Sequence, residues 1–343
     1  MKISLCLHIE KNAHTDSYQQ AYNEFITLCK MADRAGFHTL WTGEHHGMDF
    51  AITPNPLLSL ADLAHQTQSI RLGTATLIAP FWHPIRLAGE IAYTDMISHG
   101  RLEVGFSKGA FHYEYDRLKP GMNNDDAGEM MRESIQALQK LWQGNYSHQG
   151  KHWQFPETSI SPQPSQLPHP PLWVAAQSPY TIDFAIEHGC NVQMTPLWFG
   201  EDKVQECINT YQHAVQKHQA DHTKMLLLRH AFIVDSEEEK ARILAEFSTF
   251  YAEFAAWFNQ SNPVSNGNLV GDIEVGEMFT VETLAQNLLI GTAQEVLAQL
   301  KQYEAQGVDE FALWIANGMS FETKKAFLEQ FIEHVLPHFQ SNE

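Results

Sequence analysis

The amino-acid sequence predicts an α/β protein built as a (β/α)8 barrel, or TIM barrel, with insertion loops at the carboxyl-end face. Apolar, strand-like runs alternate with amphipathic helical stretches, and eight such strand-then-helix units favour a closed parallel barrel over an open sheet. The length of 343 residues agrees, because such barrels routinely run past about 250 residues as one unit. No boundary divides the sequence, so we expect a single domain over residues 1–343.

The first half of the chain supplies four of these units. Residues 3–9 alternate like a strand, and the amphipathic helix over 18–35 ends before Gly36, a residue type that adopts positive φ easily. The next three strands are expected at residues 39–42, 70–77 and 102–106, and their helices at 56–68, from Pro84 to about 98, and at 126–142.

The second half supplies strands five to eight, at residues 172–176, 191–194, 226–234 and 310–314. Residues 146–171 are rich in Pro, Gln and His, and they predict an irregular excursion with a small hairpin. Residues 260–278 hold Asn, Gly, Ser and acidic residues with little periodicity. A long loop of this kind in a compact domain is usually a mobile lid, which we expect here.

Charge and cysteine content exclude several functions. With 22 basic against 41 acidic residues, the formal net charge of −19 argues against nucleic acid and anionic membranes as partners. The four cysteines are widely spread without a C-x-x-C pair, so we expect no metal site, no disulfide framework and a cytoplasmic location. No G-x-G-x-x-G motif follows a strand, which argues against a Rossmann-type nicotinamide site.

Candidate functional residues follow the predicted strands, because the loops after the strands form the active site of such a barrel. Glu44 and His45 follow strand two, and His45 faces the barrel mouth if His46 packs sideways; the alternative is an ordinary hydrogen-bonded loop histidine. Aromatic residues beyond the strand ends are candidates for a substrate pocket, although such residues are more often core. They are Phe81, Trp82, Phe111, Tyr113 and Trp198.

An anion site is also indicated at this rim. Ser107 and Lys108 offer backbone N–H groups and a cation, while Gln177, Ser178 and Thr181 lie at the start of a helix, where phosphate binds readily. The alternative is that Ser178 merely caps that helix. The rim as a whole would suit a ligand that is planar and aromatic at one end and anionic at the other.

Several short segments stand in a specific order and spacing. They are Gly36-Phe37, LWTGEHH at 40–46, LGTAT at 72–76 with His83-Pro84, GRL at 100–102 with Gly105, MNN at 122–124, PLWVAA at 171–176 and GTAQE at 291–295. Together they make the chain resemble the bacterial luciferase-like flavin-dependent monooxygenases over nearly its whole length. The resemblance implies a TIM barrel that binds reduced FMN (FMNH2), reacts it with O2 to a flavin hydroperoxide and transfers one oxygen atom to a substrate.

The resemblance also implies roles for individual residues. His45 stands at the catalytic histidine position, beside Glu44, and Ala75-Thr76 matches a peptide that is often cis under the flavin ring. Ser107 stands where luciferase has a reactive cysteine, so light emission from an aldehyde is not expected. Lys108 stands where luciferase has an arginine that contacts the flavin phosphate. The other matches to phosphate contacts are Gln177, Ser178 and Thr181.

The expected partners are a small-molecule substrate and a separate NAD(P)H:flavin reductase. The family resemblance also implies a second copy of the chain in a homodimer. An aromatic pocket in an acidic protein suits a pyridinium cation such as trigonelline (N-methylnicotinate) by cation–π attraction. The same pocket would suit an alkanal, so an alkanal monooxygenase stays open.

Two further functions stay open. A deazaflavin-dependent hydride-transfer oxidoreductase would need several basic residues at the mouth for its cofactor's polyanionic tail, and the sequence offers few. A non-catalytic flavin-binding partner subunit tends to lose the histidine that is present here as His45.

Overall fold

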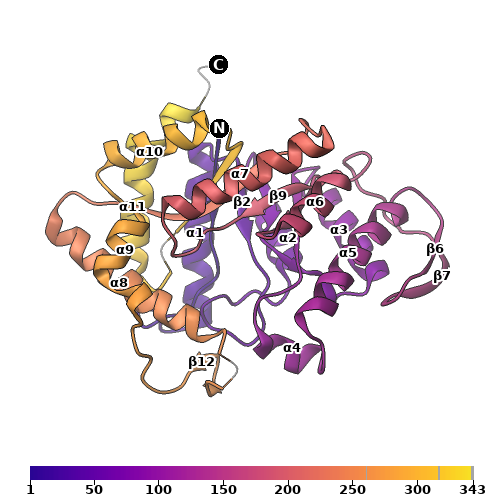
Figure 1. Cartoon of the computed structure of the whole chain (residues 1–343), viewed down its shortest axis with the longest axis horizontal. Coiled ribbons are helices and arrows are strands. Elements are labelled where there is room, and N and C mark those ends of the chain that lie inside the picture. Colours follow the sequence, from indigo (N-terminus) through magenta and orange to yellow (C-terminus); the bar gives the residue numbers. More distant parts are fainter. Residues whose placement is uncertain (260, 316, 341–343) are drawn as a thin grey trace.

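The computed structural model describes residues 1–259, 261–315 and 317–340, and within them eight parallel strands close into a barrel (Figure 1). Each strand pairs with the next, and the last pairs with the first. In order around the barrel the strands are β1 (Lys2–Cys6), β2 (Thr39–Thr42), β3 (Arg71–Thr74), β5 (Leu102–Ser107), β8 (Leu172–Ala175), β9 (Asn191–Met194), β10 (Met225–Ile233) and β14 (Glu310–Trp314). The predicted fold class is confirmed.

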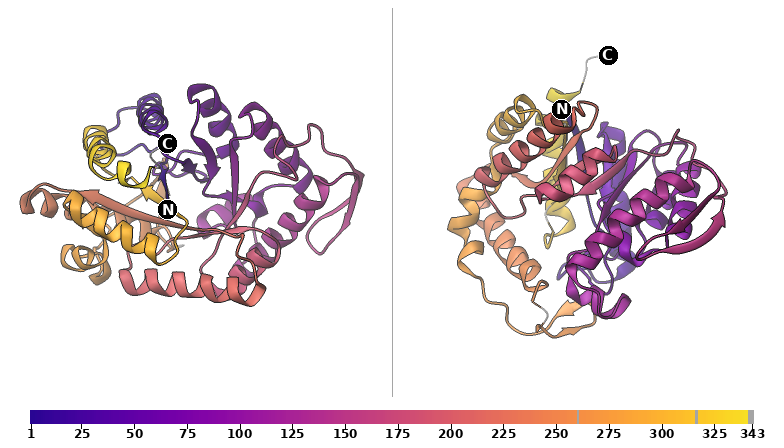
Figure 2. Two further views of the ribbon diagram at one scale, coloured as in Figure 1. Left: turned by 90° about the horizontal axis from the view of Figure 1, so that it is seen from above. Right: turned by 45° about the vertical axis from the view of Figure 1, so that its right-hand side comes forward.

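Helices cover the outside of the strands (Figure 2). Ser17 caps the first helix with its hydroxyl, and Gly36 ends it at φ 84°. The outer helices are α1 (Tyr18–Ala35), α2 (Pro56–Gln66), α3 (Pro84–Ile97), α5 (Asn124–Leu141), α6 (Pro179–Glu187), α7 (Glu201–His218), α8 (Glu237–Ala256), α10 (Ala293–Ala305) and α11 (Phe321–His334). Among the described residues, no helix is long and apolar enough to cross a membrane.

Several shorter elements decorate the barrel. The excursion over 146–171 contains the expected hairpin, and the segment predicted as a lid contains another, whereas Gln260, the first residue of that segment, lies outside the described residues. Figure 1 shows α4 and β12 at the end of the molecule opposite to the N-terminus. The short elements are β4 (Leu77–Ile78), η1 (Ala79–Phe81), α4 (His112–Leu118), β6 (Tyr146–Gln149), β7 (Gln154–Thr158), β11 (Val264–Ser265), β12 (Asn268–Leu269), η2 (Glu277–Phe279), α9 (Val281–Asn287), β13 (Leu289–Gly291) and η3 (Leu336–Phe339).

Two predicted details were wrong. The single strand expected over 70–77 is two strands, because the Ala75-Thr76 peptide between β3 and β4 is cis and breaks the ladder. Residues 112–118, for which the sequence predicts no helix, form α4; its N-cap residue Phe111 makes no side-chain hydrogen bond, so the start of this helix leaves little trace in the sequence.

The amino end of the barrel is sealed by large side chains. Trp41 and Trp173 contact each other with ring centroids 5.5 Å apart, and a Cβ on Gly73 would lie 2.2 Å from the Trp41 ring, so only glycine fits there. The buried Glu310 carboxylate accepts hydrogen bonds from Ser4 Oγ at 2.5 Å and from Trp41 Nε1 at 2.8 Å. A ligand can therefore enter the barrel only at the carboxyl ends of the strands, the barrel mouth.

Candidate active site

The barrel mouth is open where the strands end. Most strand residues are buried, but side chains at the carboxyl ends are partly exposed and small. These partly exposed residues are Ala75, Thr76, Ser107, Ala175 and Thr195. They make a shallow floor without charged side chains, onto which a flat aromatic group can be laid.

The cis peptide is fixed in this floor by its neighbours. The N–H of Ala75 donates to Thr42 O at 2.8 Å, and Thr76 O accepts from the N–H of Glu44 at 2.9 Å. The Thr76 hydroxyl donates to Ser107 Oγ at 2.6 Å. A Cβ on Gly43 would lie 2.7 Å from Ala75 O, so the loop after β2 passes this close only because residue 43 is glycine.

His45 stands in the loop between β2 and α2, with its side chain 19 % exposed. Its Nδ1 lies 3.4 Å from Oε1 of Glu114, a buried carboxylate on α4 that also accepts the His46 N–H at 2.8 Å. Among the described residues, neither His45 Nδ1 nor Glu114 Oε2 has a well-formed hydrogen bond. The pair therefore retains free capacity for proton exchange. Glu114 was not among the predicted site residues.

Aromatic rings surround the His45 imidazole. Phe50 and Phe111 lie with ring centroids 5.1 and 5.4 Å from it, and both contact Phe254 of α8. A cavity of about 410 Å³ continues outward from Phe50 between α8 and residues 267–275. This wall excludes water from one side of the imidazole. Of Phe50, Phe111 and Phe254, only Phe111 was predicted as a pocket residue.

The Glu44 carboxylate points away from this wall. Its Oε2 accepts hydrogen bonds from the Ile78 N–H at 2.8 Å and from Trp82 Nε1 at 2.9 Å, and its Oε1 lies 2.8 Å from Nε2 of His46. Phe81 packs edge-on against His46 with centroids 5.6 Å apart. Glu44, Trp82 and Phe81 thus form a buried corner, the Glu44 corner, and His46 packs sideways as the sequence suggested.

The other predicted pocket residues lie elsewhere at the mouth. Tyr113 packs edge-on against Trp257, with centroids 5.3 Å apart, and belongs to the same aromatic wall as Phe111. Trp198, beyond β9, packs edge-on against Tyr251 and Phe279 on the other side of α8. The structure thus brings Phe111 and Tyr113 together near His45 but not with Trp198 or with the Glu44 corner.

The predicted phosphate contacts gather at neighbouring strand ends, since β5 pairs with β8. Ser178 caps α6: its Oγ accepts the Thr181 N–H at 3.3 Å and lies 3.0 Å from the Thr181 hydroxyl. Gln177 donates to Thr195 O at 2.8 Å. Lys108 is exposed, so its ammonium is open to solvent. A helix N-terminus, two hydroxyls and an exposed ammonium are a donor set that fits a phosphate.

Two buried histidines, His8 and His230, lie behind the residues of the mouth, and neither was predicted from the sequence. Burial, and to a smaller degree the nearby His45, lowers the pKa of His8 to about 3. Burial lowers the pKa of His230 to about 3 as well. Both imidazoles are therefore neutral at physiological pH. Both lie in runs that the sequence predicts as apolar strands, 3–9 and 226–234, where a histidine resembles a core residue.

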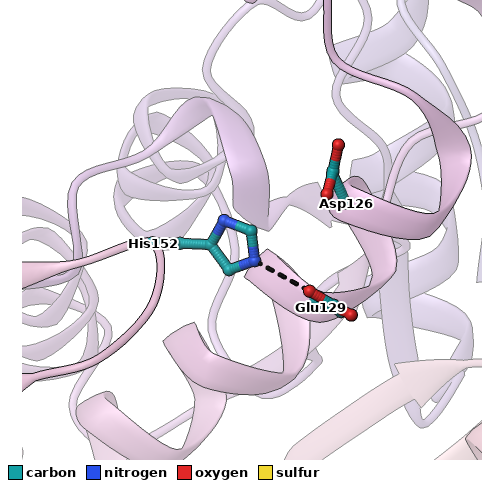
Figure 3. A group of neighbouring side chains, drawn as sticks. All are labelled: Asp126, Glu129 and His152. Atoms are coloured by element: carbon teal, nitrogen blue, oxygen red, sulfur yellow. Dashed lines mark hydrogen bonds and ion pairs between the residues drawn. The ribbon is translucent and has the colours of Figure 1, made fainter.

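A group of possible metal ligands lies far from the mouth, on α5 and the turn of the β6–β7 hairpin (Figure 3). His152 Nε2 lies 3.1 Å from Glu129 Oε2, and Asp126 stands next to them. Lys151 forms an ion pair with Glu129 and lies 3.9 Å from Asp126. Lys151 thus neutralises the carboxylates of Asp126 and Glu129. These contacts between the hairpin turn and α5 attach the hairpin to the helix.

Comparison with known proteins gives consistent matches. The model of the luciferase-like monooxygenase family matches residues 1–310. The oxygenase component of the flavin-dependent trigonelline monooxygenase of Acinetobacter baylyi is 47 % identical over 348 residues, which cover 100 % of this chain and 97 % of that relative.

Two solved structures have the same fold. A monooxygenase from Streptomyces bottropensis superposes with a TM-score of 0.84 at 25 % identity, covering 99 % of this chain and all of that one. The FMN-bound oxygenating constituent of 3,6-diketocamphane monooxygenase from Pseudomonas putida superposes with a TM-score of 0.76 at 20 % identity, covering 98 % of each chain.

Proposed function

The chain belongs to the luciferase-like monooxygenase family, and from this premise we propose that it is the oxygenase component of a two-component, FMNH2-dependent monooxygenase. Its proposed substrate is a small N-heterocyclic compound such as trigonelline (N-methylnicotinate), the compound in the name of the 47 % identical relative. The observation that carries the proposal is His45, a mouth imidazole paired with a buried carboxylate and walled by aromatic rings.

The residues at the mouth fit FMN. The uncharged floor that includes Ala75, Thr76 and Ser107 would lie under the isoalloxazine ring. The Lys108 ammonium and the hydroxyls of Ser178 and Thr181 would hold the phosphate. Lysine is a point charge without the two-pronged geometry of arginine, so the α6 N-terminus carries a larger share of the phosphate contacts.

When bound, reduced FMN supplies two electrons to O2, so that one oxygen atom enters the substrate and the other leaves as water. His45 would exchange protons with the reacting oxygen through Nε2, while Glu114 Oε1, 3.4 Å from Nδ1, would balance the charge of the protonated imidazole. Phe50 and Phe111 keep bulk water away, which protects the reaction from premature loss of hydrogen peroxide.

A separate NAD(P)H:flavin reductase would deliver FMNH2, as expected for an oxygenase component. We also propose a homodimer, which size-exclusion chromatography with light scattering would test. We also propose that the segment predicted as a mobile lid, residues 260–278, closes over the mouth; its hairpin at 264–269 lies beside the cavity at the aromatic wall, and residue 260 lies outside the described residues.

The decisive experiment mixes photoreduced FMN, O2 and N-methylnicotinate with the purified protein and follows products by mass spectrometry. We expect a product that contains one additional oxygen atom, and a product without added oxygen or no product at all would overturn the proposal. The variant His45→Ala should bind FMN normally but release H2O2 in place of product. An unchanged ratio of product to H2O2 in His45→Ala would refute the role of His45.

A further inference from the structure

The cavity beside the aromatic wall combines carboxylates with aromatic rings. Its volume of about 410 Å³ lies within the roughly 300–1,000 Å³ of pockets that hold small ligands. Two of its lining residues are acidic, Glu253 of α8 and Asp272 on the opposite side, and none of the described lining residues is basic. The aromatic lining residues are Phe50, Phe250, Phe254 and Trp257.

The charge of Glu253 is poorly compensated within the described part of the chain. The residue is exposed to the cavity, but the surrounding protein removes part of its hydration and so raises the pKa of its carboxyl above the usual value. The nearby Glu10 carboxylate, which forms an ion pair with Lys324, raises this pKa further. Both influences disfavour the negative charge of Glu253, and a cation in the cavity would stabilise it.

The cavity shares aromatic rings with the surroundings of His45. Phe50 lines the cavity, and its ring centroid lies 5.1 Å from that of the His45 imidazole. The rings of Phe254 and Trp257 lie with centroids 5.7 and 6.1 Å from Phe50. A small molecule held against Phe50 would therefore lie next to the proposed catalytic histidine, where the substrate of the proposed reaction has to be placed.

Carboxylates beside aromatic faces suit an organic cation. The face of an aromatic ring attracts a cation, and the attraction is stronger where water is excluded. A metal ion is a poorer occupant, because Ca²⁺ takes about six to eight oxygen ligands, whereas the described lining offers two carboxylates, one on each side. An N-alkylpyridinium fits better, since its charge is spread over a flat ring and its nitrogen carries no proton that needs an acceptor.

We propose that Glu253, with the ring faces of Phe50 and Trp257, binds the positively charged ring of the substrate and selects an N-alkylpyridinium over an uncharged ring of the same shape; this assignment rests on the proposed function. Asp272 adds to the negative potential from the other side of the cavity. The carboxylate of N-methylnicotinate would point away from Glu253, because like charges repel. Glu253 thus determines specificity and takes no part in the transfer of oxygen.

The test compares two ligands of the same shape by calorimetry on the purified protein with FMN added. They are N-methylnicotinate and 3-methylbenzoate, which has a carbon atom in place of the charged ring nitrogen, and the wild type should bind the first more tightly. Glu253→Gln keeps the size of the side chain but removes its charge. We expect it to weaken N-methylnicotinate about fivefold, as for the loss of one partly solvated charge pair. Binding of 3-methylbenzoate should stay equal or become tighter, because a repulsion from its carboxylate is removed.

Glu238→Gln is the matched control. It makes the same chemical change in the exposed first turn of the same helix, away from the cavity, and should leave both affinities unchanged. An equal loss in Glu238→Gln would show that the net charge of the protein, and not the cavity, determines binding.

A second variant tests the ring faces. Trp257→Leu keeps an apolar side chain but removes the aromatic face, and it should weaken N-methylnicotinate about fivefold and 3-methylbenzoate less. Because Trp257 is buried against Tyr113, circular dichroism has to show that this variant is folded. A wild type without preference for N-methylnicotinate, or an equal or absent effect of Glu253→Gln on the two ligands, would overturn the inference. A wild type that shows the expected selectivity but does not oxygenate N-methylnicotinate would instead overturn the proposed function.

Discussion

Replacing Glu44 by alanine should destabilise the fold more than it impairs the chemistry directly. The carboxylate is 2 % exposed and interacts at 2.8–2.9 Å with the Ile78 N–H, Trp82 Nε1 and His46 Nε2. Loss of a hydrogen bond to a charged group costs about 1.5–3 kcal/mol. Because the three losses share one site and are not additive, we expect about 3–5 kcal/mol in total for Glu44→Ala.

Urea denaturation followed by circular dichroism measures this loss. Glu44→Gln is the control, because its amide oxygen can still accept from Ile78 and Trp82, so its cost should be about 1 kcal/mol. We further expect Glu44→Gln to bind FMN and to yield product like the wild type. A wild-type unfolding midpoint for Glu44→Ala would refute the structural role. A stable Glu44→Gln without product would instead support a direct catalytic role for this carboxylate.

Three more predictions concern the sealed amino end of the barrel, the phosphate site and the lid. Burial raises the pKa of Glu310 from 4.5 to about 7. Between these two pH values the native state binds more protons than the unfolded state, so the free energy of unfolding falls by about 3 kcal/mol as the pH rises. Glu310→Gln should therefore stabilise the protein against urea at pH 8 and not at pH 5, and an equal effect at both would contradict this. Lys108→Ala should weaken FMN about tenfold in fluorescence titrations but leave riboflavin, which lacks the phosphate, unchanged. Asp49→Ala, which removes the 3.0 Å hydrogen bond from Asn268, should speed amide exchange at residues 264–269 about fivefold, and unchanged exchange would show that the hairpin is held otherwise.

The sequence was sufficient for the barrel and for the positions of most site residues along the chain. The strands expected at 39–42 and 191–194 coincide with β2 and β9, in which the apolar residues Leu40, Trp41, Val192 and Met194 are buried. Barrel geometry then forces the residues after each strand to one end. For this reason His45, Thr76 and Ser107 could be assigned to the mouth without knowledge of any side-chain contact.

Side-chain direction could not be read from the sequence. Glu44 and His45 are adjacent, yet the Glu44 carboxylate turns into a buried corner, whereas the His45 imidazole faces Phe50 and Phe111. Glu114 reaches His45 from α4, roughly 70 positions further along the chain, and no local sequence pattern links the two residues. Contacts between segments far apart in the chain decide such partners.

The net charge of −19 raises the question of how this chain would hold a phosphate at all. At physiological ionic strength, charges separated by more than about 8 Å are largely screened. In the acidic first turn of α8, Glu237 and Glu238 are exposed, so solvent screens their charges and they contribute little to the field at the mouth. Local groups decide instead, and at the proposed phosphate site these are Lys108 and the α6 N-terminus. The proposed substrate, a zwitterion, has no net charge for the overall field to repel, so its selection would depend on short-range contacts with the aromatic rings of the mouth.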